Sequence, residues 1–398
     1  MRIGLVAGEA SGDQLGAGLI RALKARNPAL QFEGVAGRAM QQMGCAAWED
    51  AEVLAVMGLI EPLKEIPRLL KLRRMLIERW TRNPPAVFVG IDAPDFNLGL
   101  EIALKKVGIP TVQYVSPSVW AWRQGRVRKI ARAVDRVLCL LPFEQAFYHR
   151  HGIAADFVGH PLADSIPVGL SREHARRQLN IRSTQVVAVL PGSRKSEVTR
   201  LGPVFAAASR LLLGKLPDLT FVAPMANEAL GSMFRSQLEE GGVAGHYCLL
   251  ERNAQTAMAA SDVVLLASGT AALEAALLAR PIVAAYRLAP LTYALARSLR
   301  LVKVRHFTLP NLLTPDPLVP EFLQGDATAQ ALSDSVFGLL QDPERRADIE
   351  REFAKLRDQL ARGADQRAAK AVLELAGAEG AAGVSGSNSG FPDGRSAP

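Results

Sequence analysis

Short apolar segments alternate with longer stretches of helical periodicity along most of this sequence. Polar or turn residues flank the apolar segments. Short apolar segments flanked in this way are typical of strands buried on both faces of a parallel sheet. Alternation of this kind predicts an α/β fold in which helices cover both faces of each sheet. The expected strands lie at 3–7, 32–35, 87–91, 111–115, 136–141 and 156–158 in the first half, and at 186–190, 220–223, 247–250, 263–267 and 282–285 in the second.

Two such series of strands predict two Rossmann-like domains, each a doubly wound parallel sheet, that face a cleft. The 398 residues leave room for two domains of ordinary size. After the last helical pattern the sequence is rich in Gly, Ser and Ala, a composition that predicts disorder. We expect one domain over 1–165, a second over 166–343, C-terminal helices over 344–376 that pack across domains or subunits, and a disordered tail over 377–398.

The clearest candidate for a phosphate site follows the expected strand 263–267. Ser-Gly-Thr at 268–270 comes next, and 271–279 is rich in Ala and Leu, which favour a helix. A helix that starts directly after a buried strand presents free backbone N–H groups and a positive dipole end to an anion. Glu274 lies one helical turn later, within reach of a ligand held there. An ordinary strand–turn–helix with a capped helix is the alternative, because short motifs recur by chance.

A second junction between strand and helix lies at 190–195, with the sequence Leu-Pro-Gly-Ser-Arg-Lys. Its Arg194 places a guanidinium group where it can meet a phosphate. A surface turn is the alternative. Because both junctions follow parallel strands of one domain, they share a sheet edge, and two such junctions favour a phosphate site over chance.

In the first half, the strand 87–91 is followed by Asp92, at the sheet edge where such folds bind ligands. A carboxylate there is a candidate general base, and a helix cap or turn residue is the alternative. The loop 8–13 lacks the glycine spacing of dinucleotide-binding loops and the lysine of a P-loop. Its Glu9 and Asp13 would repel a pyrophosphate, so the loop suits a hydroxyl-rich ligand or is a tight turn.

The charge balance narrows the range of partners. The net charge is +8 and the isoelectric point about 9.6, which favours phosphates, nucleic acid or anionic lipid as binding partners.

Three scattered cysteines indicate a reducing compartment and no structural zinc. The chain opens on a strand, so no signal peptide is expected. The most apolar window, 263–279, is better explained by strand plus helix than by a membrane span.

Two basic segments remain to be interpreted. Residues 57–80 combine Leu and Ile with Lys and Arg. This composition fits a helix that lies at a bilayer interface, and it also fits a helix whose apolar face packs on the sheet. Helices that pack on a sheet are the commoner of the two. Residues 116–132 interleave Trp120 and Trp122 with arginines, which suggests nucleic acid. No recognised nucleic-acid module accompanies them, so we expect a solvated helix face or a phosphate clamp instead, and no nucleic-acid partner.

The chain also carries distinctive strings of sequence, at 8–13, 90–97, 114–122, 190–194, 268–274 and 309–313. Tyr-Val-Ser-Pro-Ser-Val-Trp-Ala-Trp and Ile-Asp-Ala-Pro-Asp-Phe-Asn are the most specific of them. Together they resemble the lipid-A-disaccharide synthase family over residues 1–376.

The resemblance implies an inverting glycosyltransferase of the GT-B fold. It would join UDP-2,3-diacylglucosamine to 2,3-diacylglucosamine 1-phosphate (lipid X), giving the β-1,6-linked lipid A disaccharide 1-phosphate and UDP, a step towards the lipopolysaccharide of Gram-negative outer membranes. The first domain would take the acceptor and face the membrane, and the second would bind the UDP-sugar. The family works on the cytoplasmic face of the inner membrane, so a peripheral protein on an anionic membrane surface is expected. Because the family's C-terminal helices can pair subunits, a homodimer is a further expectation.

The resemblance also implies roles for individual residues. Asp92 would take the proton of the acceptor hydroxyl, and Arg194 with the helix start at Ser268 would offset the charge of the leaving UDP; no metal and no cofactor are expected. Both substrates carry acyl chains, which favours membrane contact by 57–80. The expected substrate-binding residues are Glu9, Ser11, Gly12, Asp13, Asn97, Arg194, Ser268, Gly269, Thr270, Glu274, Asn311 and Gln324, and the expected membrane contacts are Ile60, Leu63, Ile66, Leu69 and Leu70.

Two other classes of function stay open. A different GT-B enzyme, such as a UDP-N-acetylglucosamine epimerase or a peptidoglycan glycosyltransferase, would share the phosphate site of the second half. It would lack the Trp-Ala-Trp segment and the amphipathic stretch. A non-catalytic peripheral lipid-binding protein is the second class.

Overall fold

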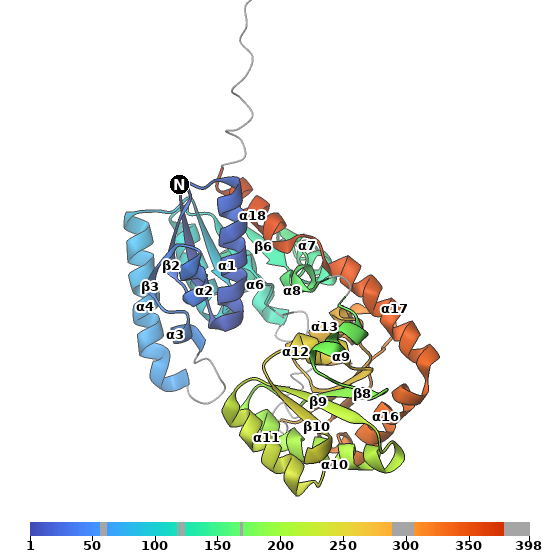
Figure 1. The fold of residues 1–398 in the computed structure, drawn as a ribbon. Helices are drawn as coiled ribbons and strands as arrows, with labels where there is room; N and C mark the ends of the chain where they lie inside the picture. The colour runs from blue at the N-terminus through green and yellow to red at the C-terminus, as the bar shows by residue number, and fades with distance from the viewer. Residues whose placement is uncertain (56–61, 118, 120–123, 168–169, 289–305, 378–398) are drawn as a thin grey trace, which may run out of the picture. The chain divides into compact units, whose positions relative to one another are not determined.

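The computed structural model describes residues 1–55, 62–117, 119, 124–167, 170–288 and 306–377. These residues form two compact units (Figure 1). Unit 1 holds the described residues up to Val158 and those from Gly363, and unit 2 holds those from Gly159 to Arg362. The chain therefore leaves the first unit before the boundary expected at 165, and it returns to that unit for its last helix.

Unit 1 is built on a seven-stranded sheet in the order β3-β2-β1-β4-β5-β6-β7, and every pair of neighbours is parallel. The strand order reverses between β1 and β4, and ligands bind beyond the carboxyl ends of the strands at such a switch point. Ala7 pairs with Ile91, so the residues that follow these two strands are neighbours. The strands are β1 (Arg2–Ala7), β2 (Gln31–Val35), β3 (Cys45–Glu49), β4 (Val87–Ile91), β5 (Thr111–Tyr114), β6 (Arg136–Cys139) and β7 (Ala155–Phe157).

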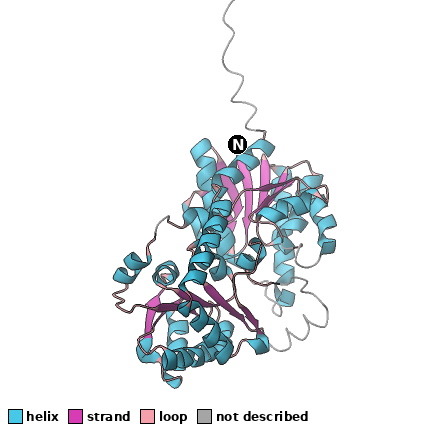
Figure 2. Ribbon diagram, turned by 90° about the vertical axis from the view of Figure 1, so that its right-hand side faces the viewer, coloured by secondary structure: helices cyan, strands magenta, loops and turns pink. Residues whose placement is uncertain are grey.

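Helices cover both faces of this sheet (Figure 2). On one face, apolar residues of α1 and α18 join the strands in a buried cluster that includes Leu19, Leu23 and Val372. On the other, α4 and α5 build a second cluster around Trp80, whose side chain is fully buried against Phe88. The helices of unit 1 are α1 (Glu9–Arg26), α2 (Arg38–Gln42), α3 (Glu52–Ala55), α4 (Pro62–Arg82), α5 (Pro94–Lys106), η1 (Gln124–Arg126), α6 (Val127–Ala133), α7 (Pro142–His149) and α18 (Ala364–Leu375).

Unit 2 repeats the plan with a six-stranded parallel sheet in the order β10-β9-β8-β11-β12-β13. Its switch point lies between β8 and β11, where Leu190 pairs with Leu266. The strands are β8 (Val186–Leu190), β9 (Thr220–Met225), β10 (Tyr247–Glu251), β11 (Val263–Ala267), β12 (Ile282–Tyr286) and β13 (Glu321–Leu323). The helices are α8 (Pro161–Ser165), α9 (Arg172–Gln178), α10 (Lys195–Lys215), α11 (Glu228–Glu240), η2 (Ala244–His246), α12 (Ala254–Ala260), α13 (Thr270–Leu277), α15 (Leu309–Leu313), η3 (Gln324–Asp326), α16 (Ala329–Gln341) and α17 (Pro343–Leu360).

The expected fold of two parallel-sheet α/β domains is confirmed. The C-terminal helical pattern is divided into α17 and α18, and each packs within its own unit, α17 on α13 and α18 on α1. Among the helices that the structure describes, none combines the length and the apolar character that a membrane span requires.

Candidate active site

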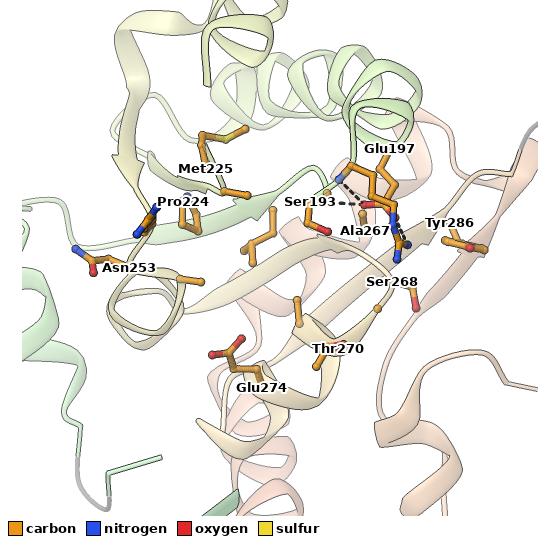
Figure 3. A pocket seen from close by; sticks show the side chains of 18 residues that line it. Ser193, Glu197, Pro224, Met225, Asn253, Ala267, Ser268, Thr270, Glu274 and Tyr286 are labelled. Carbon is orange, nitrogen blue, oxygen red and sulfur yellow. Dashed lines mark hydrogen bonds and ion pairs between the residues drawn. The ribbon is translucent and has the colours of Figure 1, made fainter. Parts of the chain in front are cut away.

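A cavity of about 550 Å³ opens beyond the ends of β8 and β11, at the switch point of the unit 2 sheet (Figure 3). The structure brings together here the residues that the sequence marked as a nucleotide site in the second half. They are Arg194, Ser268, Gly269, Thr270 and Glu274.

The start of α13 forms one wall of this cavity. Ser268 follows β11 and donates its backbone N–H to Ala285 O at 2.9 Å, which fixes the end of the strand. The cap residue Gly269 offers the helix no side-chain cap, and it is exposed together with Thr270. The positive end of the helix dipole therefore faces the cavity, an arrangement that favours an anion.

Glu274 projects from α13 one turn beyond this helix start (Figure 3). Its side chain is half-buried, and burial raises the pKa of the carboxyl, while a hydrogen bond with Gln255 acts in the opposite direction. A carboxylate in this position can accept hydrogen bonds from hydroxyl groups of a ligand.

Arg194 reaches the cavity from the turn before α10, and its side chain is 77% exposed. Glu197, in the first turn of that helix, holds the turn in place. Its Oε2 accepts the backbone N–H groups of Ser193 at 2.9 Å and Arg194 at 3.2 Å, and its Oε1 lies 3.4 Å from the Arg194 guanidinium. Glu197 is not among the residues expected from the sequence, although a Glu three residues after a helix cap is a known signature of a helix start.

The wall facing α13 contains two residues in the left-handed backbone region, Arg252 at φ 64° and Asn253 at φ 57°. They follow β10, and Arg252 N–H donates to Met225 O at 2.9 Å, which joins the turns after β10 and β9. Consecutive non-glycine residues in this region are uncommon and concentrate at functional sites. The sequence does not predict this wall, because side-chain type alone does not report backbone conformation.

Unit 1 has a smaller cavity of about 150 Å³ at its own switch point, lined by Glu9, Leu54 and residues 92–95. Asp92 is half-buried, and burial followed by the charge of Glu9 raises the pKa of its carboxyl. Three of the lining residues have positive φ: Glu9 at 57°, Asp92 at 52° and Ala93 at 39°. The two turns approach so closely that a Cβ on Gly8 would lie 2.6 Å from the Cβ of Ala93. Backbone strain and a carboxyl with a raised pKa mark this cavity as a candidate catalytic site.

The backbone of Asp92 is held from both sides. Its N–H donates to Tyr114 O at 2.9 Å, and its carbonyl accepts Asn97 Nδ2 at 2.9 Å and Gln113 Nε2 at 3.1 Å. These bonds leave the carboxylate of Asp92 at the cavity.

Several other expected substrate-binding residues have their polar atoms engaged by the protein. The segment 8–13, expected as a loop, forms the start of α1, which begins at Glu9. Asp13 there is buried and accepts the N–H groups of Ala39 and Met40 at 2.8 and 3.0 Å, so it caps α2. Asn311 is buried and bonds Leu318 and Val319, and Gln324 Oε1 accepts Leu288 N–H at 2.9 Å. Ser11 is exposed on α1, beside the buried Gly12.

The expected membrane contacts fall in and before α4. Ile66 and Leu70 are 41% and 51% exposed, four residues apart on one face of the helix. Leu69 is 8% exposed and packs in the cluster with Leu72, because it lies on the sheet side of the helix. Ile60 and the side chain of Leu63 lie outside the described residues.

Within the described part of the chain, no group of three or more His, Cys, Asp or Glu side chains is placed to hold a metal ion.

Known proteins of one family are similar to this chain over nearly its whole length. The family model described as lipid-A-disaccharide synthetase matches residues 3–374. A lipid-A-disaccharide synthase of Alkalilimnicola ehrlichii is 52% identical over 383 residues, covering 96% of this chain and all of the relative. One of Xanthomonas campestris pv. campestris is 49% identical over 378 residues, covering 94% of this chain and 86% of the relative.

Similar solved structures share the fold at low sequence identity. A UDP-GlcNAc 2-epimerase from Neisseria meningitidis bound to UDP-GlcNAc superposes with a TM-score of 0.56 at 14% identity, covering 94% of this chain and 99% of that one. The glycotransferase of kitacinnamycin superposes with a TM-score of 0.59 at 16% identity, covering 94% and 98%. These neighbours confirm the GT-B fold expected from the sequence.

Proposed function

This chain belongs to the lipid-A-disaccharide synthase family of glycosyltransferases, and we propose that it joins UDP-2,3-diacylglucosamine to lipid X with inversion at the donor carbon. The products would be the β-1,6-linked lipid A disaccharide 1-phosphate and UDP. The observation that carries the proposal is the unit 2 cavity, where a cationic side chain, an uncapped helix start and a carboxylate share one space suited to a nucleoside diphosphate.

In this proposal the donor's diphosphate lies at the start of α13. Backbone N–H groups near Gly269 and the guanidinium of Arg194 donate to its oxygens, and the Glu274 carboxylate accepts from the ribose hydroxyls. The same groups stabilise the charge that develops on UDP as it leaves, because they are already oriented before the reaction. Glu197 supports this role by holding the turn that carries Arg194.

Asp92 acts as the general base of the proposed reaction. It removes the proton from the 6-hydroxyl of lipid X as that oxygen attacks the donor carbon. The bond between this carbon and the UDP oxygen breaks on the opposite face, so the configuration inverts. A raised pKa makes the ionised carboxylate of Asp92 a stronger base than an ordinary carboxylate. Glu9, beside it, is placed to accept from sugar hydroxyls.

The proposal includes contact with an anionic bilayer through α4. Ile66 and Leu70 supply exposed apolar side chains, and Arg68, Lys71 and Arg74 on the same helix are exposed cations. In this proposal the enzyme works at the cytoplasmic face of the inner membrane. The homodimer stays a prediction from the sequence.

Incubation of the purified protein with UDP-2,3-diacylglucosamine and lipid X tests this function. Mass analysis should find one disaccharide monophosphate per UDP released, and NMR should assign a β-1,6 linkage. Incubation with UDP-N-acetylglucosamine alone separates the alternative, because conversion of that nucleotide without an acceptor would identify an epimerase. An α linkage would reject inversion while keeping the transfer.

A further inference from the structure

A carboxyl group that the proposed reaction does not use lies beneath the Asp92 turn. Glu101 is on α5, its side chain is fully buried, and neither carboxyl oxygen has a hydrogen-bond partner among the described residues. A buried ionised carboxylate without partners is costly, so this group requires an explanation.

Two buried amides of unit 1 each have an unbonded oxygen. Asn97 precedes Glu101 by one helical turn, and Gln113 on β5 pairs in register with Gly90 on β4. Neither Asn97 Oδ1 nor Gln113 Oε1 has a hydrogen-bond partner in the described part of the chain. A Cβ on Gly90 would lie 2.5 Å from Glu101 Oε1 and 3.0 Å from Asn97 Cγ, so Gly90 provides the space in which these two side chains meet. The space therefore holds acceptor atoms with no matching donor.

The nitrogens of the same two amides hold the proposed base. Asn97 Nδ2 and Gln113 Nε2 both donate to the carbonyl of Asp92, whose φ of 52° is unfavourable for a residue with a side chain. If the Asn97 amide turned over, its oxygen would face the Asp92 carbonyl and the bond would become a repulsion. A group that orients the Asn97 amide therefore also stabilises the strained turn at Asp92.

A proton on Glu101 would supply the missing donor. Burial raises the pKa of Glu101 well above its ordinary value, whereas the charges of Lys129 on α6 and Lys105 on α5 act in the opposite direction. Lys105 is already committed, because its Nζ lies 2.8 Å from Asp135 Oδ1 and donates to Val134 O at 2.6 Å. Desolvation is therefore the dominant influence on this carboxyl, and it favours the neutral acid.

We propose that Glu101 is a positioning residue whose carboxyl group, in its acid form, donates a hydrogen bond to Asn97 Oδ1 and thereby orients the amide that holds Asp92. The inference rests on the proposed role of Asp92 as base. It assigns Glu101 no contact with substrate. A neutral carboxyl is the required form, because only the acid carries a donor.

Two substitutions separate positioning from charge and from packing. Glu101→Gln keeps a donor without a charge, so kcat should stay within about threefold of the parent. Glu101→Leu fills similar volume without a donor, so kcat should fall about tenfold or more, while the dissociation constant for UDP stays unchanged. The rate is expressed per folded molecule, with the folded fraction of each variant taken from circular dichroism of the whole chain, because UDP binding reports only on unit 2. Equal loss of kcat in both variants, or full kcat in Glu101→Leu, overturns the proposal.

A stability measurement decides the protonation state without any transfer assay. Burial raises the pKa of Glu101 in the folded protein above its pKa in the unfolded chain. At a pH between these two pKa values, the folded protein holds a proton on Glu101 that the unfolded chain has lost. The free energy of unfolding therefore falls as the pH rises. Denaturant unfolding of the parent and Glu101→Gln from about pH 5 to about pH 8 should show the variant gaining stability relative to the parent. The exposed Glu78→Gln serves as the control and should give no such trend. Parallel curves for the parent and Glu101→Gln overturn the acid form even if Glu101→Leu does not fold. If the parent lacks transfer activity, the proposed function fails while this measurement still reports on Glu101.

Discussion

Glu9 and Asp92 follow the neighbouring strands β1 and β4 and line one cavity, where burial and the charge of Glu9 raise the pKa of Asp92. Replacing Glu9 with Gln removes that charge and should lower the pKa of Asp92. Because the base acts only when ionised, the acid limb of the profile of kcat/KM against pH should move to lower pH.

Asp95→Asn is the matched control for this shift. Asp95 lines the same cavity, but its carboxylate forms an ion pair with Arg126 and is not a cause of the shift in Asp92. The control should leave the acid limb in place. An acid limb that stays in place or moves upward in Glu9→Gln would mean that Glu9 does not raise the pKa of Asp92.

Arg194 is expected to act through the diphosphate. Arg194→Ala should weaken UDP binding about 10- to 100-fold, because charge-assisted hydrogen bonds are lost, and should leave uridine binding unaffected. Calorimetry at one fixed salt concentration measures both ligands. Arg210→Ala, on the exposed side of α10, the helix that follows Arg194, removes an equal charge and should change UDP affinity by less than about twofold. If both substitutions weaken UDP binding equally, Arg194 acts only through its general positive charge and not through contact with the diphosphate.

Glu274 is expected to recognise the ribose. Glu274→Gln should weaken UDP binding about tenfold, since an amide accepts weaker hydrogen bonds than a carboxylate. The same substitution should leave the affinity for 2′,3′-dideoxy-UDP unchanged, because that ligand lacks the hydroxyls. Competition against a fluorescent UDP analogue gives both affinities. If both ligands lose affinity equally, Glu274 acts on the helix start instead.

The exposed apolar residues of α4 give a test of membrane contact. Changing Ile66 and Leu70 together to Ser should lower binding to phosphatidylglycerol vesicles about tenfold, because buried apolar area is lost. Val107→Ser is the control, since Val107 is 50% exposed at the end of α5 and lies off this helix. Cosedimentation measures the bound fraction. Binding equal to that of the parent would place the bilayer contact elsewhere.

The sequence predicts most clearly the elements whose pattern comes from burial on both faces. Strand β11 has the expected bounds, Val263–Ala267, because its apolar run is flanked by polar residues. The edge strands β3 and β13 were missed. β3 has exposed residues in its middle and β13 has only three residues, none of them buried, so neither gives the pattern of a strand buried on both faces.

The candidate sites were predicted from their position at strand ends, and their supporting residues were not. Asp92 and Arg194 follow β4 and β8, and parallel topology brings such residues to a switch point. Glu101 gave no signal, because a Glu within a helix is usually exposed, and its burial depends on α5 facing Gly90. Asp13 was expected to bind substrate because it lies near the end of a strand, but its carboxylate instead caps another helix.

The rate of transfer by Asp92→Asn tests the central proposal most directly. The amide keeps the size of the side chain but cannot take a proton, so kcat with both acylated substrates should fall by at least about a hundredfold. UDP affinity should match that of the parent, because the unit 2 cavity is unchanged. A variant that binds UDP normally and transfers at the parental rate would contradict the assignment of Asp92 as the base.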